Sequence, residues 1–373
     1  MQLRQLWLSD FRNYPSFELH LPPGLTVLGG ANGEGKTNLL EAVAYLATLA
    51  SFRGAPNEAL VRDGCSRAVV RGLGERSGRE ILVEAEVLAT GRGRATLNRQ
   101  PVRRTADLAD GVACSVFSPD DIDLVKGGPA GRRRMLDELL VHLHPRADVQ
   151  RRDLERILRQ RTALLRQMAA GGGGRGPLRP DTTTTLAVWD AKLVEVGEAV
   201  GAARAELVTG LGPGVDAAYR ALSGPDDPIP STSAVALAYD APWRAGGLGR
   251  ALAAVRADEL RRGVCLAGPH RDDLVITLAG MPARTHSSQG EQRSLALALR
   301  LAAHRMVTDR LGEPPLLLLD DVFSELDATR RSALLVELPP GQAVLTTTGP
   351  VPEGAEVAQL LPLARVGAGG DGR

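Results

Sequence analysis

The order of apolar and polar positions predicts strands and a helix in the first third of the chain. Apolar side chains alternate with polar ones within Leu3–Leu8 and Phe17–Leu21, and Leu25–Leu28 is continuously apolar or β-branched. Asn38–Leu49 carries its apolar residues at helical spacing, which predicts a helix. Residues 67–100 alternate again, which predicts a small antiparallel sheet.

A helical region follows, in which apolar positions recur every three or four residues. Pro145 interrupts it, and the glycine-rich run 171–177 separates two further helices. The heptad-like positions are Leu154, Leu158, Arg161, Leu165 and Met168 in the first helix, and Leu186, Trp189, Leu193, Val196, Val200, Ala203 and Leu207 in the second. This spacing fits an antiparallel coiled-coil hairpin and fits two helices of an ordinary bundle equally well.

The C-terminal third returns to α/β patterning. The expected strands and helices are Leu274–Leu278, Ser294–Thr308, Leu316–Leu319, Ala328–Leu338 and Ala343–Leu345. The tail from Val351, which ends in GAGGDGR, is expected to be frayed. The patterns together predict a head formed by 1–118 with 263–373, and an inserted α-rich arm at 119–262.

Composition narrows the class of protein. The 373 residues suffice for two or three domains, and 45 basic against 44 acidic side chains give a net charge of +1. That balance excludes a uniformly basic nucleic-acid coat, so any nucleic-acid contact must be a local patch. Cys65, Cys114 and Cys265 show no CxxC spacing, and no apolar run approaches the ~20 residues of a membrane span. A cytoplasmic protein without membrane association is expected.

The first motif that indicates a functional site is a complete GxxxxGK[ST] sequence. It lies between the predicted strand at Leu25–Leu28 and the predicted helix at Asn38–Leu49. Its residues are Gly30, Ala31, Asn32, Gly33, Glu34, Gly35, Lys36 and Thr37. Glycines let backbone amides and a helix N-terminus face phosphate oxygens. We therefore expect Lys36 to pair with the β- and γ-phosphates of a nucleotide and Thr37 to ligate Mg²⁺.

A second motif supplies the carboxylates that such a site needs. Leu316–Leu319 predicts a buried parallel strand, and Asp320 and Asp321 follow at its carboxyl end, where ligands bind in open α/β sheets. Asp320 is the expected Mg²⁺-associated Walker B carboxylate. Asp321 is the candidate to orient or deprotonate the attacking water.

A third motif resembles the LSGGQ signature of ABC-type ATPases. In Ser287–Arg293, the serine, second glycine and glutamine positions are occupied by Ser288, Gly290 and Glu291, and Gln289 replaces the first glycine. A helix cap with Glu291 at its third position would explain the same residues. The location between the P-loop and Walker B favours the signature, and Ser324–Asp327 falls where such ATPases carry the D-loop.

Four blocks of sequence resemble the bacterial RecF family of recombination-repair ATPases. They are Phe11–Tyr14 with the GANGEGKTN loop, Pro119–Asp137, Gly268–Leu274, and SSQGEQRS continuing to LLLLDDVFSELD. The resemblance implies an ABC-type ATPase head, with a mixed P-loop sheet and an antiparallel β lobe, and an α-rich inserted arm. It also adds Arg12 and Asn38 to the nucleotide-binding residues.

The resemblance further implies an ATP-dependent homodimer in which Ser288 of one subunit completes the partner's nucleotide site. Its members bind DNA at gaps or single-strand/double-strand junctions and act with RecO and RecR to load RecA in repair, replication and the SOS response. Thr347 or a neighbour stands where transporters carry a switch histidine, and Asp321 replaces glutamate. Both features suggest slow hydrolysis. Together with the resemblance, they imply a weak ATPase that DNA stimulates.

Two alternatives share the same motifs: the ATP-binding subunit of an ABC transporter, and a nucleotide-sensing scaffold with little turnover. A basic cluster in the arm fits either a phosphate-binding face or a solvated helix face balanced by acidic residues. Its members are Arg132, Arg133, Arg134, Arg151, Arg152, Arg156, Arg159, Arg161 and Arg166. His270 could act through hydrogen bonding or directly in chemistry.

Overall fold

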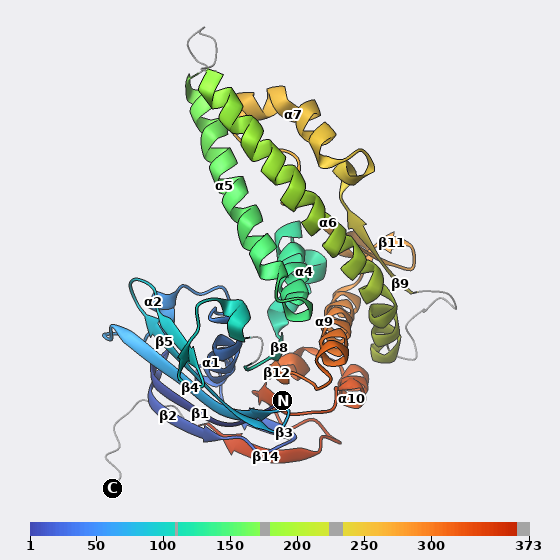
Figure 1. Ribbon diagram of the computed structural model, residues 1–373. Helices are drawn as coiled ribbons and strands as arrows, with labels where there is room; N and C mark the ends of the chain where they lie inside the picture. Colours follow the sequence, from blue (N-terminus) through green and yellow to red (C-terminus); the bar gives the residue numbers. More distant parts are fainter. Residues whose placement is uncertain (109–110, 172–179, 224–233, 364–373) are drawn as a thin grey trace. The chain divides into compact units, whose positions relative to one another are not determined.

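The computed structural model describes residues 1–108, 111–171, 180–223 and 234–363 (Figure 1). Its contacts divide the chain into two units. The first unit comprises Met1–Ile122, Ala217–Ile229 and Ser288–Arg373, and the second comprises Asp123–Asp216 and Pro230–Ser287. Residues 263–287 therefore group with the second unit, whereas the sequence prediction assigned them to the head.

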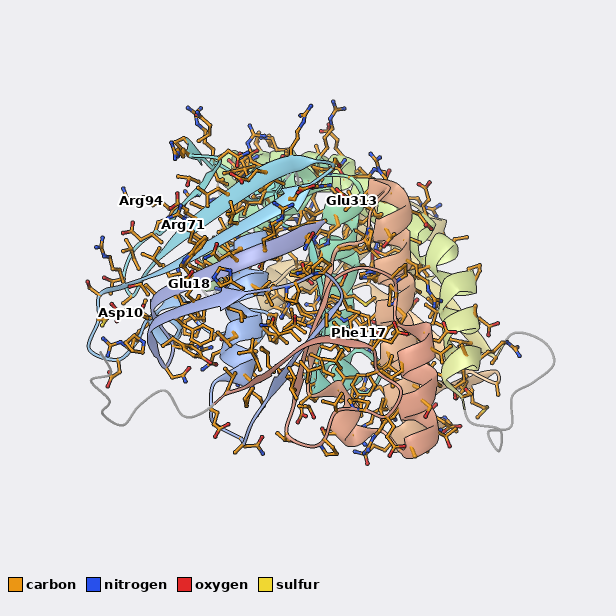
Figure 2. All side chains as sticks on the ribbon, turned by 90° about the horizontal axis from the view of Figure 1, so that it is seen from below. Asp10, Glu18, Arg71, Arg94, Phe117 and Glu313 are labelled. Carbon is orange, nitrogen blue, oxygen red and sulfur yellow. The ribbon has the colours of Figure 1, made fainter. Side chains whose placement is uncertain are left out.

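An antiparallel sheet forms one layer of the first unit. Its strands, in spatial order, are β2 (Tyr14–His20), β1 (Gln2–Phe11), β4 (Arg67–Arg76), β5 (Arg79–Leu88), β6 (Arg94–Leu97) and β7 (Gln100–Pro101). The strands predicted near the N-terminus thus join those predicted within 67–100 in a single lobe. Figure 2 shows Arg71 and Arg94 on this sheet, and the Arg71 guanidinium lies 5.0 Å from the ring centroid of Trp7.

The P-loop belongs to a parallel sheet. Its strands, in spatial order, are β14 (Val357–Pro362), β3 (Leu25–Gly29), β13 (Ala343–Thr347), β12 (Leu316–Asp320) and β8 (Cys114–Phe117). Every neighbouring pair among these described strands is parallel, so the sheet that carries the P-loop is not itself mixed as expected. Among the described strands of the first unit, the antiparallel strand pairs belong to the other sheet. The expectation of a frayed tail is wrong for Val357–Pro362, because this segment pairs with β3. Residues 364–373 lie outside the described residues.

Helix α1 (Lys36–Thr48) supplies the core between these sheets. Its Leu39, Leu40 and Leu46 are buried in one cluster with Leu3 of the antiparallel sheet and Leu318 of the parallel sheet. The remaining helical segments of the unit are α2 (Asn57–Leu60), η1 (Thr105–Leu108), η2 (Pro119–Ile122), α9 (Gln289–Leu311), η4 (Val322–Glu325) and α10 (Ala328–Glu337). This packing fixes both sheets around the helix that follows the P-loop.

The second unit is mainly helical. Its helical segments are α3 (Asp123–Lys126), α4 (Pro129–Leu143), α5 (Ala147–Gly171), η3 (Pro242–Ala245), α7 (Leu248–Arg262) and α8 (Ala283–His286), with α6 (Pro180–Leu222) through Asp216. A three-stranded sheet has the order β11 (Met281–Pro282), β10 (Asp273–Leu278), β9 (Val235–Asp240). Most of the glycine-rich run 171–177 lies outside the described residues.

The heptad-like positions of α5 and α6 face a shared core. Leu154 of α5 packs with Leu193 and Val200 of α6, and Leu158 is partly buried against the same cluster. Leu248 and Leu252 of α7 and Trp243 of η3 join the same cluster. Because a third helix covers the seam, the packing is that of a bundle rather than of a two-stranded coiled coil.

Candidate nucleotide-binding site

The P-loop conformation requires glycine at its end. Gly35 has φ +96°, and a Cβ there would lie 2.6 Å from Asn13 Nδ2 and 2.7 Å from Tyr14 Oη. Gly33, with φ +85°, also adopts a conformation that side chains disfavour. The loop joins β3 to α1, so the unpaired N–H groups at the start of that helix face the loop, the arrangement that binds phosphate.

Lys36 lies within the loop. Only 6% of the residue is exposed, and its Nζ donates hydrogen bonds to the carbonyl oxygens of Gly30 and Ala31, each at 2.7 Å. Both of these hydrogen-bond partners are uncharged. Phosphate oxygens, which form stronger charge-assisted bonds, would therefore be favourable partners.

The two Walker motifs meet directly, although they are far apart in sequence. Thr37 Oγ1 donates to Asp320 Oδ1 at 2.7 Å across a separation of 283 residues. Thr346 Oγ1, from the neighbouring strand β13, donates to the same oxygen at 2.8 Å. Burial raises the pKa of Asp320, while these hydrogen bonds act in the opposite direction. A cation beside this carboxylate would relieve the cost of its buried charge.

Asp321 occupies an unusual backbone position beside this pair. Its φ is 48°, and its N–H donates to Thr346 Oγ1 at 2.9 Å. Within the described residues, its buried Oδ1 has no hydrogen-bond partner. Thr346, for which the sequence offered only the vague expectation of Thr347 or a neighbour, therefore positions both aspartates. Thr347 Oγ1 instead donates to Gly349 O at 3.3 Å.

Arg12 and Asn38 support the start of α1. Arg12 donates from Nε and Nη2 to the two carboxylate oxygens of Glu41, at 2.8 and 2.9 Å, and from Nη1 to Ala59 O at 2.7 Å. Asn38 Nδ2 donates to Asn13 Oδ1 at 2.8 Å. Glu41, which is fully buried, escaped the sequence analysis. The available signal was an acidic residue within an apolar helix, because a buried carboxylate requires a cationic partner.

Ser288 is the N-cap of α9. Its Oγ accepts a hydrogen bond from Glu291 N at 3.3 Å, and Glu291 Oε2 accepts from Ser288 N at 2.6 Å. Ser288 and Glu291 therefore form a capping box. This box is compatible with a role of Ser288 as the serine of a signature motif. Within the described part of the chain, Ser288 makes no hydrogen bond to Lys36 or Asp320.

A magnesium ion suits the residues at the Walker junction. Mg²⁺ sites in nucleotide-binding proteins commonly use one or two protein oxygens together with phosphates. The Thr37 hydroxyl and the Asp320 carboxylate supply such a pair. No group of three or more His, Cys, Asp or Glu side chains suited to a metal occurs within residues 1–108, 111–171, 180–223 and 234–363.

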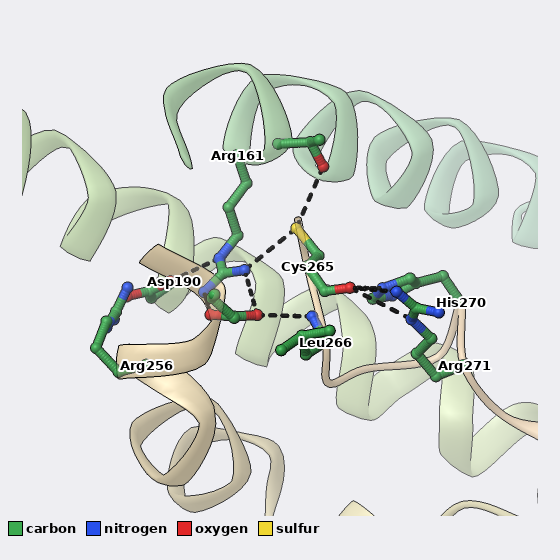
Figure 3. Close-up of polar contacts among 9 residues, drawn as sticks. Arg161, Asp190, Arg256, Cys265, Leu266, His270 and Arg271 are labelled. Carbon is green, nitrogen blue, oxygen red and sulfur yellow. Dashed lines mark hydrogen bonds and ion pairs between the residues drawn. The ribbon is translucent and has the colours of Figure 1, made fainter. Parts of the chain in front are cut away.

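Two of the nine arginines in the basic cluster of the arm are buried. Arg132 is 4% exposed and pairs with Asp273 at 2.7 Å. Arg161, whose polar contacts Figure 3 shows, is fully buried. These two arginines are therefore removed from the candidate phosphate-binding face. Arg151 pairs with Asp148 at 2.8 Å, as expected for a charge-balanced helix face. Neutralised guanidiniums contribute little to attraction of a polyanion.

The third sequence block, Gly268–Leu274, organises the second unit. Asp272 accepts hydrogen bonds from Tyr239 Oη at 2.6 Å and Trp243 Nε1 at 2.7 Å. His270 Nε2 lies 3.2 Å from Cys265 O, and burial lowers the pKa of this histidine to about 4. His270 is therefore neutral at pH 7 and serves hydrogen bonding within the unit.

Comparison with known proteins decides the family. Residues 2–341 match the model of the RecF/RecN/SMC N-terminal domain. The DNA replication and repair protein RecF of Kineococcus radiotolerans is 47% identical, over 96% of this chain and 95% of its own. The chain belongs to the RecF family. A second RecF, from Frankia alni, is 46% identical over 93% of each chain, so the transporter alternative is not favoured.

Solved structures agree with this RecF assignment. A RecF recombination mediator with bound ATP, from the RecFOR pathway, has a TM-score of 0.83 and 27% identity, covering 94% of this chain and 92% of its own. The Smc head domain of Pyrococcus furiosus has a TM-score of 0.52 and 16% identity, covering 94% and 90%. The latter likeness shows the fold alone. The predicted ABC/SMC-type head with helical additions is confirmed.

The lengths and apolar character of the helices bear on whether any of them could span a membrane. Among the helices that the structure describes, none is both long and apolar enough to cross a membrane.

Proposed function

We propose that this chain is a DNA-binding ABC/SMC-like ATPase of recombinational repair, in which ATP controls assembly of a homodimer. The contact between Thr37 Oγ1 and Asp320 Oδ1, at 2.7 Å, carries the proposal. It brings the last residue of the P-loop to the Walker B carboxylate in a member of the RecF family. The RecF relatives and the RecF–ATP structure support ATP as the ligand.

The residues of the site have separable tasks. Lys36 would exchange its two carbonyl contacts for the β- and γ-phosphates, while Thr37 and Asp320 would hold the metal. Mg²⁺, when bound, would neutralise charge that develops on the phosphates. Asp321 Oδ1 would accept a hydrogen bond from the attacking water, because this buried oxygen has no other partner among the described residues.

The nucleotide would also act as a bridge between two heads. Ser288, at the start of α9, would donate to the γ-phosphate bound by the partner subunit, near the positive end of that helix. ATP binding would create the dimer, and loss of the γ-phosphate would release it. The dimer would bind gapped or junction DNA through phosphates, and would act with RecO and RecR in RecA loading in the cytoplasm.

Turnover with and without DNA tests this function. The expected result is slow ATP hydrolysis that gapped duplex DNA accelerates, and Lys36→Ala should abolish both nucleotide binding and hydrolysis. Slow hydrolysis is expected because Thr347 or a neighbour stands where transporters carry a switch histidine, and because Asp321 is shorter than glutamate. Binding of ATP without any turnover would favour the nucleotide-sensing scaffold. Unchanged ATP affinity in Lys36→Ala would remove the P-loop from the site.

A further inference from the structure

Two arginines connect the signature segment (Ser287–Arg293) and Ser294, the next residue of α9, to the D-loop segment (Ser324–Asp327). Arg293 Nη1 donates to Glu325 O at 3.2 Å, and Arg293 Nη2 lies 2.8 Å from Glu325 Oε2. Arg330, on α10, donates from Nε to Ser294 Oγ at 3.1 Å and from Nη1 to Asp327 Oδ2 at 2.5 Å. Each arginine thus joins one segment to the other.

The signature glycine lies against the second of these arginines. A Cβ at Gly290 would be 3.6 Å from Arg330 Nη1, so the turn that carries Ser288 rests on the Arg330 guanidinium. Ser294, which accepts from Arg330, is only 1% exposed. A displacement of the turn that carries Ser288 would therefore move Arg330, because its guanidinium contacts this turn on one side and Asp327 on the other.

The D-loop segment is in turn joined to the candidate water-orienting residue. Ser324 Oγ donates to Asp321 O at 2.8 Å, and Ser324 N donates to the same oxygen at 3.3 Å. Asp321 holds a left-handed backbone conformation with φ 48°, which costs energy and persists only where its surroundings hold it. Movement of Glu325 or Asp327 would therefore reach the carboxylate at position 321.

We propose that Arg293 and Arg330 are positioning residues that couple the signature segment of each head to the hydrolysis site of the same head. When Ser288 binds the partner's nucleotide, the coupling places Asp321 for attack at its own nucleotide. The two nucleotide sites of the dimer then hydrolyse ATP together. This inference rests on the proposed function and extends it, since it concerns neither nucleotide binding nor dimer formation itself.

The test separates hydrolysis from assembly. Arg293→Gln should leave the affinity of the monomer for ATP and dimerisation with AMP-PNP within about twofold of wild type, because Lys36 and Ser288 remain. ATP hydrolysis by the dimer should fall about tenfold, the effect of losing one charge-assisted positioning contact. The exchange Arg293→Glu with Glu325→Arg should restore part of that rate, since the ion pair is re-formed in reverse.

Arg305→Gln provides the matched control. Arg305 also joins α9 to α10, through an ion pair with Glu337, but lies farther along both helices. Its hydrolysis should stay near the wild-type rate. An equal loss in Arg305→Gln, or a wild-type rate in Arg293→Gln, would overturn the coupling. Wild-type protein that neither dimerises with ATP nor hydrolyses it would instead refute the proposed function.

Discussion

The buried arginine in the arm gives a stability prediction that can be worked out from its contacts. Arg161 of α5 donates to both carboxylate oxygens of Glu259 on α7, at 2.9 and 2.5 Å, and from Nε to Asp190 of α6 at 2.8 Å (Figure 3). The side chains of Arg161 and Glu259 are fully buried. One guanidinium therefore neutralises a carboxylate that has no access to water.

Replacing Arg161 with leucine should destabilise the protein by about 3–5 kcal/mol, because removing one partner of a buried ion pair leaves the other charge uncompensated. Within the described residues, the Glu259 carboxylate would then accept a hydrogen bond only from Leu266 N, at 2.8 Å. Asp190 would keep its ion pair with Arg256. Glu259 thus dominates the cost.

The double variant Arg161→Leu with Glu259→Gln should recover much of the loss, leaving about 1–2 kcal/mol, because glutamine carries no charge and can still accept from Leu266 N. Arg156→Leu is the control on the same helix. Arg156 is 59% exposed and pairs with Asp153, so its loss should cost at most about 0.5 kcal/mol.

Urea unfolding, followed by the helical circular dichroism signal at 222 nm, measures these differences in the free energy of unfolding. Hydrogen exchange in α5, α6 and α7 would show where in the structure the stability is lost. The reasoning would be refuted if Arg161→Leu lost no more stability than Arg156→Leu. It would be refuted equally if removal of the Glu259 charge restored nothing.

Three further predictions concern the first unit. Asp320→Asn should lower Mg²⁺-dependent hydrolysis at least about 100-fold while ATP affinity changes little, and equal losses in both assays would contradict the Walker B role. Gln342→Ala should lower the free energy of unfolding measured in urea by about 2–4 kcal/mol, since Gln342 bonds to Leu3 N and O at 2.7 Å and is 4% exposed. Burial lowers the pKa of His304 to about 4, so on acidification the unfolded chain binds a proton at this residue at a higher pH than the folded chain does. The free energy of unfolding should therefore fall by up to about 3 kcal/mol between pH 6.5 and pH 4. His304→Leu should lose that part of the acid sensitivity.

The sequence was most informative where structure depends on neighbouring residues. The strand, P-loop and helix from Leu25 to Thr48 follow one another locally, and the buried strand Leu316–Asp320 is recognisable from its apolar run. Contacts between distant residues gave no such pattern. Val357 pairs with Leu25, and Arg161 meets Glu259 across 98 residues, so neither the last strand nor the buried ion pair could be predicted.

The candidate site shows the same division. Lys36, Thr37 and Asp320 lie where the motifs predicted a junction, although their roles toward a nucleotide remain proposals. Thr346 was missed because its importance comes only from the neighbouring strand, which sets its hydroxyl against Asp320. A threonine at the end of a strand carries no distinctive signal by itself.

The central claim is that ATP joins two heads through Ser288, and sedimentation of Ser288→Arg tests it most directly. The variant should bind ATP as a monomer nearly as wild type does, because Lys36, Thr37 and Asp320 are unchanged. Wild-type protein should sediment as a dimer with ATP, whereas the variant should remain a monomer because the arginine would obstruct the partner's γ-phosphate. A variant that still dimerises with ATP, or that loses ATP binding as a monomer, would contradict the role assigned to this residue.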